Sequence, residues 1–254
     1  MRHAIADVLL LGKRNLLRFR RSPEMVIGFL VQPVMFILLF VYVLGGAIQT
    51  PGLDYVDFLM PGIIVQTIAF GGFVTAIALA EDLKKGLIDR FRSLPIARSA
   101  VLAGRTVSDV VTNTVSLAVM LAVGLAIGFS FNANVLEIVG GIVLLLMMGY
   151  AFSWIFALLG LSSSTPEAAQ QVGFIIIFPL TFASSAFVPI DSMPSWLQAF
   201  ATVNPFTVIV DAMRALWLGT PAGNSIWGAV AWSVGLIAIF APIATWRYKT
   251  TVSG

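Results

Sequence analysis

Long runs of apolar residues separated by short polar segments make up most of the sequence. A run of roughly 20 apolar residues is long enough to cross a bilayer as an α-helix. Such runs predict six spans, at residues 25–45, 58–80, 107–129, 138–161, 171–189 and 226–245. The pattern therefore predicts an all-α polytopic membrane protein with one transmembrane domain, residues 1–254.

A seventh apolar stretch, residues 196–218, is long enough to span but carries polar and helix-breaking residues. These are unfavourable inside hydrocarbon: Gln198, Asn204, Pro205, Asp211 and Arg214. We therefore predict that residues 190–220 form a partly embedded segment on the outer side, before the last span.

The basic residues support an even number of spans. Lys and Arg in short loops mark the cytoplasmic side of a membrane protein. With six spans, the basic residues of the N-terminal segment, of the loop after the second span and of the C-terminal tail share one side. Seven spans would place Arg247 and Lys249 outside. Both termini are therefore predicted to be cytoplasmic.

Two of the cytoplasmic segments have the periodicity of amphipathic helices. One apolar stripe, ended by Pro95, follows the second span at helical spacing: Leu83, Leu87, Phe91 and Leu94. We predict a helix over residues 81–95 that docks into a groove of a protein partner or lies on lipid headgroups. Residues 1–22 predict a second amphipathic helix at the inner membrane interface.

Composition excludes several classes of chemistry. Hydrophobic residues make up 59% of the chain and charged residues 11%, against about a quarter charged in soluble domains. Cysteine is absent and there is one His, so no thiolate metal site, metal cluster or Ser-His catalytic pair is predicted. The sequence lacks the G-x-x-x-x-G-K-[ST] loop that cradles phosphates, so we expect no hydrolysis of ATP by this chain.

Polar residues inside the predicted spans are few. Asp109 and Glu137 fall near span ends and are expected to reach water. For others, such as Gln32 and Gln66, hydrogen bonding between helices is the favoured role, and lining a path is the alternative. Thr165 is predicted to cap a helix that begins at Pro166.

Two sequence segments resemble one known family. The run EDLKKGLIDRFRSLPIARSAVLAGR, residues 81–105, resembles the first cytoplasmic loop of type 2 ABC transporter permeases, and most closely the drug-resistance branch that includes daunorubicin exporters. The run FVPIDSMPSWLQAFATVNPFTVIVDAMRALWLG, residues 187–219, is similar to the last extracytoplasmic segment of the same family. With six spans and an amphipathic N-terminus, the resemblance covers essentially the whole chain.

The resemblance implies a half-transporter in a bacterial inner membrane. Two permease chains, as a homodimer or with a second permease, would bind two separate ATPase subunits, which hold the ATP and Mg. This chain would bind no cofactor of its own and no nucleic acid, and lipids would surround it. Residues 190–220 would be re-entrant. Residues 81–95 would be the coupling helix, with these contacts to the ATPase: Asp82, Leu83, Gly86, Leu87, Arg90, Phe91, Leu94 and Pro95.

The expected function is export of a hydrophobic or amphipathic substrate, drug-like or lipid. Candidates for the substrate path are aromatic or small polar residues of the first two spans: Phe36, Thr67, Phe70 and Phe73. Asp211 and Arg214, at i and i+3, are predicted to form a structural ion pair. Two alternatives stay open, namely export of a lipid-linked glycan or cell-surface lipid, and a non-transporting membrane anchor or assembly subunit. An ion-coupled carrier would need intramembrane charges that the spans lack.

Overall fold

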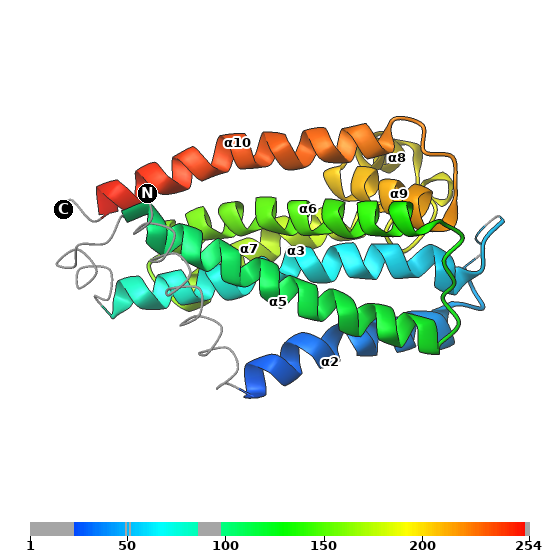
Figure 1. Cartoon of the computed structure of the whole chain (residues 1–254), viewed down its shortest axis with the longest axis horizontal. Helices are drawn as coiled ribbons and strands as arrows, with labels where there is room; N and C mark the ends of the chain where they lie inside the picture. The colour runs from blue at the N-terminus through cyan, green and yellow to red at the C-terminus, as the bar shows by residue number, and fades with distance from the viewer. Residues whose placement is uncertain (1–22, 49, 51, 86–97, 252–254) are drawn as a thin grey trace.

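The computed structural model describes residues 23–48, 50, 52–85 and 98–251 (Figure 1). Within these residues the chain is helical and contains no strand, which confirms the all-α prediction for this part. The helices are α2 (Pro23–Leu39), the π-helical turn η1 (Phe40–Leu44), α3 (Tyr55–Lys84), α5 (Arg98–Ala126), α6 (Val135–Ser162), α7 (Pro166–Phe182), the 3₁₀ turn η2 (Ile190–Ser192), α8 (Ser195–Val203), α9 (Pro205–Leu218) and α10 (Ser225–Thr251).

Four of the described helices are long and apolar enough to cross a membrane. They are α3, the Gly104–Ala126 part of α5, α6 and the Ser225–Tyr248 part of α10. Helices α2 and α7 have 17 residues each, at the lower limit of about 17 residues for a spanning helix. These two coincide with the spans predicted at 25–45 and 171–189, so the count of six spans stays a prediction.

The long helices run side by side along the long axis of the molecule, with α2 and α10 on opposite flanks (Figure 1). Helix α3 lies at the centre and packs against α6, α7, α5, α9 and α2. In its most apolar window 78% of α3 is buried, against 11% of α10. The described helices thus form a bundle around α3, with α10 at its periphery.

Glycines allow α3 and α6 to approach closely. A Cβ atom at Gly160 of α6 would clash with the backbone of Ala76, and one at Gly72 of α3 would clash with the ring of Phe156. Close contact between small residues is a main source of helix association in bilayers. The α3–α6 contact is therefore the structural centre of the bundle.

Helix α7 ends earlier than predicted. The apolar run predicts a span to residue 189, but the helix stops at Phe182 and residues 183–189 leave it. The last carbonyl groups of a helix need other donors, and here the Asn204 amide donates to the carbonyls of Leu180 at 2.7 Å and Ala183 at 2.8 Å. Hydropathy could not reveal this end, because the residues beyond it are mostly apolar, with two serines among them.

Helix α3 is longer than the predicted span at 58–80. It begins at Tyr55 and ends at Lys84, so the first residues of the predicted coupling helix form its last turn. Most of that predicted helix, residues 86–97, lies outside the described residues, as does the predicted interface helix over residues 1–22.

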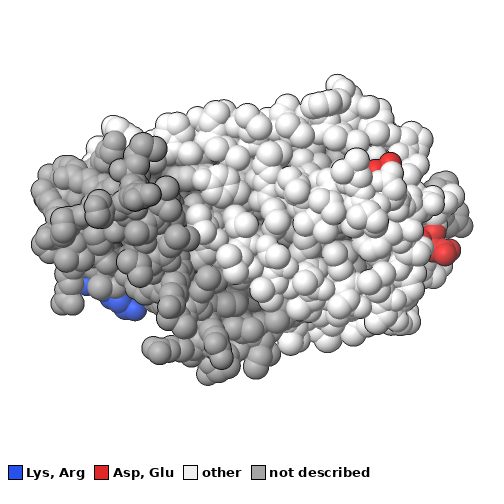
Figure 2. All heavy atoms as spheres, viewed as in Figure 1, with Lys and Arg blue, Asp and Glu red and all other residues white. Residues whose placement is uncertain are grey.

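Helices α8 and α9 form a short pair at one end of the bundle (Figure 1). Asn204 joins them and caps α9, since its Oδ1 accepts a hydrogen bond at 2.9 Å from the backbone N–H of Phe206 in the first turn. Figure 2 shows acidic side chains at this end and basic side chains toward the opposite end, with an uncharged surface between. The visible charges are thus separated along the bundle.

Candidate functional site

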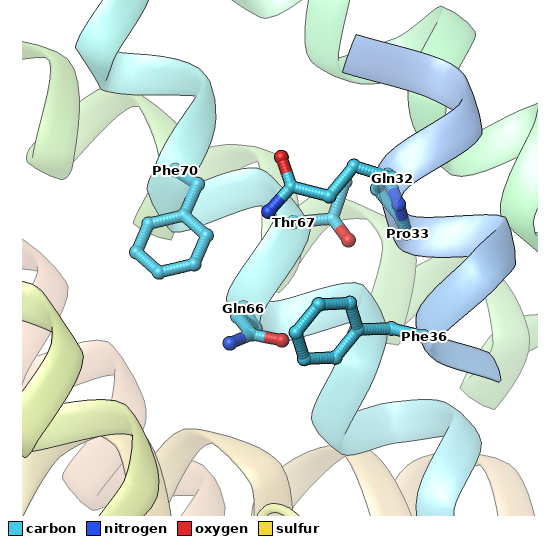
Figure 3. A pocket seen from close by; sticks show the side chains of 6 residues that line it. All are labelled: Gln32, Pro33, Phe36, Gln66, Thr67 and Phe70. Atoms are coloured by element: carbon cyan, nitrogen blue, oxygen red, sulfur yellow. The ribbon is translucent and has the colours of Figure 1, made fainter. Parts of the chain in front are cut away.

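A small pocket lies between α2 and α3. We call it the α2–α3 pocket, and its lining residues are Gln32, Pro33, Phe36, Gln66, Thr67 and Phe70 (Figure 3). Three predicted path residues, Phe36, Thr67 and Phe70, are among them. The volume is about 40 Å³, far below the roughly 300 Å³ of the smallest sites for drug-sized ligands. The pocket is therefore too small for such a ligand unless α2 and α3 separate.

Gln66 is the most unusual residue of this pocket. It is 5% exposed, and among the described residues its side-chain amide has no hydrogen-bond partner. In Figure 3 the amide lies beside the ring of Phe36. The helix-to-helix bond favoured for Gln66 is not formed in this part of the chain, so the amide can bond to an entering molecule.

Thr67 and Phe73 differ from Gln66 in that both already have partners. The Thr67 hydroxyl donates to the Ile63 carbonyl of its own helix at 2.7 Å. Phe73 lies next to the pocket, with its ring centroid 5.4 Å from that of Phe70 and 4.6 Å from that of Phe156. The four predicted path residues therefore form one aromatic and polar patch on α2 and α3.

A larger cavity, of about 500 Å³, opens at the α8–α9 end of the bundle. We call it the end cavity. Its lining is mixed: Leu53, Phe58, Ser185, Pro189, Ile190, Asp191, Asp211, Arg214, Thr220, Pro221, Ala222, Asn224 and Ser225. Polar and apolar side chains thus share a space large enough for a small molecule.

Arg214 in the end cavity is fully engaged by the protein. It is 5% exposed, and its Nη1 pairs with Asp211 Oδ1 at 3.0 Å. Its Nε and Nη2 donate to the Phe58 carbonyl at 3.1 and 2.8 Å, and Nη2 also donates to the Ser185 carbonyl at 2.7 Å. Nη1 also donates to the Ser185 hydroxyl at 3.2 Å. The guanidinium therefore joins α9 to the first turn of α3 and to residues 183–189, and it has no donor left for a ligand.

A second buried cluster joins α3 and α5 toward the opposite end. Arg105 Nε donates to Thr75 Oγ1 at 3.2 Å, and its Nη2 donates to the Val74 carbonyl at 2.6 Å. The Thr75 hydroxyl donates to the Asp109 carboxylate. We call Thr75, Arg105 and Asp109 the α3–α5 bridge.

The bridge corrects one prediction. Asp109 does not reach water, since it is 7% exposed. It lies one helical turn from Arg105 on α5, and it accepts a hydrogen bond from the Thr75 hydroxyl of α3, so it has a partner inside the bundle. Glu137, in contrast, is exposed and completes the capping box of α6 with Asn134, as its span-end position predicts.

Two of the predicted ATPase contacts fall within the described residues. Asp82 is 5% exposed, and Leu83 packs against a cluster that includes Leu79 and Leu102. Asp82 is buried and Leu83 is partly buried, so a contact from Asp82 to a partner would need the last turn of α3 to rearrange. The other predicted contacts lie outside the described residues: Gly86, Leu87, Arg90, Phe91, Leu94 and Pro95.

Comparison with known proteins gives concordant results. A family profile described as "ABC-2 type transporter" matches residues 6–218. A daunorubicin resistance ABC transporter permease protein of Streptomyces coeruleorubidus is 36% identical over 236 residues, which cover 93% of this chain and 83% of that protein. A Mycobacterium tuberculosis protein named "Probable doxorubicin resistance ABC transporter permease protein" is 29% identical over 248 residues, covering 94% of this chain and 87% of the relative.

Proposed function

Since the chain belongs to the ABC-2 type transporter family and is a membrane permease subunit of an ABC exporter, we propose that it exports an amphipathic molecule with an uncharged polar group. The α2–α3 pocket carries this proposal, because it combines the rings of Phe36 and Phe70 with the unpartnered amide of Gln66. Aromatic faces bind apolar rings, and an amide both donates and accepts hydrogen bonds.

The pocket favours a drug-like molecule over a lipid-linked glycan. A phosphate-linked lipid carrier would be recognised by Lys or Arg, and none is among the described residues that line the pocket. The resistance named for the Streptomyces relative agrees with this choice. The end cavity, with its polar lining, is the proposed exit.

We further propose six crossings with both termini in the cytoplasm of a bacterial inner membrane. Consecutive long helices run in alternating directions (Figure 1), as six crossings require. Residues 23–44 of α2 and η1, and α7, would supply the two shorter crossings. Helices α8 and α9 would then be the re-entrant pair on the outer side, and the Asp211–Arg214 pair would neutralise its charges there.

Energy enters through a partner in this proposal. ABC-2 permeases work with a separate ABC ATPase subunit. Two such subunits, which bind ATP and Mg, would dock on residues 81–95 of two permease copies. A homodimer is the simplest assembly, and a pair with a second permease is the alternative.

Transport in inverted membrane vesicles tests the function. With the cognate ATPase co-expressed, we expect ATP-dependent uptake of daunorubicin, and no uptake when the ATPase carries an inactivated catalytic site. If the assembled complex moves neither daunorubicin nor other uncharged or cationic amphipaths, the chain is an anchor or assembly subunit. If it moves a phosphate-linked lipid instead, the glycan alternative is correct.

Co-purification tests the docking helix. Phe91→Asp and Leu94→Asp should abolish recovery of the ATPase with the tagged permease, because each places a charge on the apolar stripe. Val135→Asp is the matched control, since Val135 is 77% exposed at the start of α6. Retention of the ATPase by the stripe variants would show that docking occurs elsewhere.

A further inference from the structure

The α3–α5 bridge is a second buried polar cluster, distinct from the proposed substrate path. Arg105 is 7% exposed, Asp109 7% and Thr75 0%, and the Gly104–Ala126 part of α5 is a candidate membrane span. Charged groups within a span are unfavourable unless paired. Apolar side chains would pack α3 against α5 without this desolvation, so the cluster points to a role beyond packing.

The Thr75 hydroxyl is central to the bridge. Its oxygen accepts from Arg105 Nε at 3.2 Å, and its hydrogen is donated to Asp109. One side chain of α3 is therefore bonded to two oppositely charged side chains of α5. The Arg105 bond to the Val74 carbonyl at 2.6 Å adds a contact with the α3 backbone. Relative sliding or separation of the two helices here would break every one of these bonds.

The position of the bridge indicates that it resists separation of α3 and α5. Helices α3 and α5 are the two neighbours of the segment predicted to dock on the ATPase, since α3 ends at Lys84 and α5 begins at Arg98. At the other end, the loop that follows α5 is bonded to α3, from the Ser130 backbone N–H to Asp57 Oδ1 at 3.0 Å. A force on the connecting segment would separate α3 and α5 if nothing held them together.

We propose that Thr75, Arg105 and Asp109 are positioning residues that make α3 and α5 move as one body when the ATPase acts. The movement is then transmitted to the α2–α3 pocket, where α3 meets α2 and where a ligand needs the helices to separate. This inference rests on the proposed function, because it assumes an ATPase that acts on the segment between the two helices.

Substitution of Thr75 tests the proposal. Thr75→Val keeps the shape and removes the hydroxyl, whereas Thr75→Ser keeps the hydroxyl. We expect Thr75→Val to retain ATPase binding and basal ATP hydrolysis but to lower daunorubicin moved per ATP roughly fivefold or more, as loss of an allosteric coupling does. Thr75→Ser should restore the ratio. Thr181→Val is the matched control, because Thr181 is also fully buried and its hydroxyl donates only within its own helix, to the Ile177 carbonyl.

The distance between α3 and α5 tests the same proposal. It can be measured without a substrate and with all three bridge residues intact. The chain has no native Cys, so spin labels can be placed at Lys84→Cys on α3 and Val107→Cys on α5, both exposed positions. With the ATPase bound, the distance between the labels should be the same without nucleotide and with trapped ATP. In Thr75→Val the distance distribution should broaden or shift with ATP.

The outcomes separate this inference from the proposed function. Suppose that the wild-type complex shows ATP-dependent transport. If its label distance then changes between the two nucleotide states, or if Thr75→Val transports as efficiently as wild type, the bridge is a packing element and the inference is wrong. If the wild-type complex transports nothing, the proposed function fails, and a constant label distance in that complex would still support a rigid α3–α5 pair.

Discussion

At the scale of single residues, buried polar groups distinguish structural positions from ligand-facing ones. The guanidinium nitrogens of Arg214 donate to Asp211 and to the carbonyls of Phe58 and Ser185, and its Cζ atom lies 3.6 Å from the centre of the Phe58 ring. Gln66 is buried to the same degree and has no partner among the described residues. The bonds of Arg214 stabilise the fold, whereas the amide of Gln66 stays free to form hydrogen bonds with a ligand.

Arg214→Lys should therefore lower the stability of the protein. A lysine keeps the charge but cannot reach the two carbonyls and the carboxylate together. We expect a loss of about 1–3 kcal/mol, the cost of buried carbonyl groups left without a donor, measured by thermal unfolding in detergent. Arg247→Lys is the control, because Arg247 is exposed on α10 and its change should stay within about 0.5 kcal/mol. Equal behaviour of the two variants would contradict a structural role for Arg214.

Gln66→Leu should separate stability from transport. Leucine fills a similar volume without an unpaired amide, so stability should stay the same or rise by about 1 kcal/mol. Daunorubicin transport should show an apparent KM raised roughly tenfold, which corresponds to one lost hydrogen bond. The two measurements are thermal unfolding of the purified permease and initial uptake rates in vesicles. A clear loss of stability with unchanged KM would mean that Gln66 is a packing residue.

Sequence reasoning reached some of these residues and missed others for a definite reason. The i, i+3 spacing of Asp211 and Arg214 predicts that their side chains lie close together, and the ion pair is present in the structure. The other partners of Arg214 come from residues 29 and 156 positions away, which no local pattern encodes. Asp109 was expected in water for the same reason, because its partner Thr75 lies on another helix.

At the scale of helices, close contacts at glycine determine how the bundle packs. Gly160 of α6 lies against the backbone of Ala76 in α3, while Gly140, earlier in the same helix, faces open space. The two glycines thus have opposite environments within one element. Their replacement by alanine tests whether the contact with a neighbouring helix or the helix propensity of the residue determines stability at each position.

Gly160→Ala should destabilise the bundle by about 1–3 kcal/mol, because the added methyl group must displace the α3 backbone. Gly140→Ala should instead be neutral or stabilising by up to about 1 kcal/mol, since alanine favours the helix and meets no neighbour. Thermal unfolding of both variants in one detergent provides the comparison. If Gly160→Ala is as stable as Gly140→Ala, the α3–α6 contact is looser than the structure shows.

Helix starts were more predictable than helix ends. Thr165 accepts a hydrogen bond at 3.1 Å from the Ala168 N–H, and Pro166 is the first residue of α7, as the sequence indicates. Start signals lie within a few neighbouring residues. The end of α7 depends on Asn204, 24 positions from Leu180, so hydropathy overextends the span.

At the scale of the whole molecule, the direction of each helix and the position of charge are consistent with one topology. The loop between α6 and α7 and the end of α10 lie at the opposite end of the bundle from α8 and α9 (Figure 1). Six crossings place these two ends on opposite sides of the membrane. Seven crossings would move the end of α10 to the outer side.

Labelling of single cysteines in intact cells distinguishes six from seven crossings. The native chain has no Cys, and four exposed positions serve as reporters: Ser164, Ser192, Asn224 and Thr250. A membrane-impermeant maleimide should label Ser192→Cys and Asn224→Cys directly, but the other two only after permeabilisation. Labelling of Thr250→Cys from outside, with protection of Asn224→Cys, would establish seven crossings.

The early end of α7 has a consequence for biosynthesis. The carbonyls of Leu180 and Ala183 receive their donors from Asn204, and that of Ser185 from Arg214. A ribosome makes the acceptors first, and bare carbonyls in hydrocarbon are unfavourable by several kcal/mol each. If α7 crosses the membrane as proposed, these carbonyl groups have no donors until α9 has been made. Insertion of α7 would then be completed only together with α9.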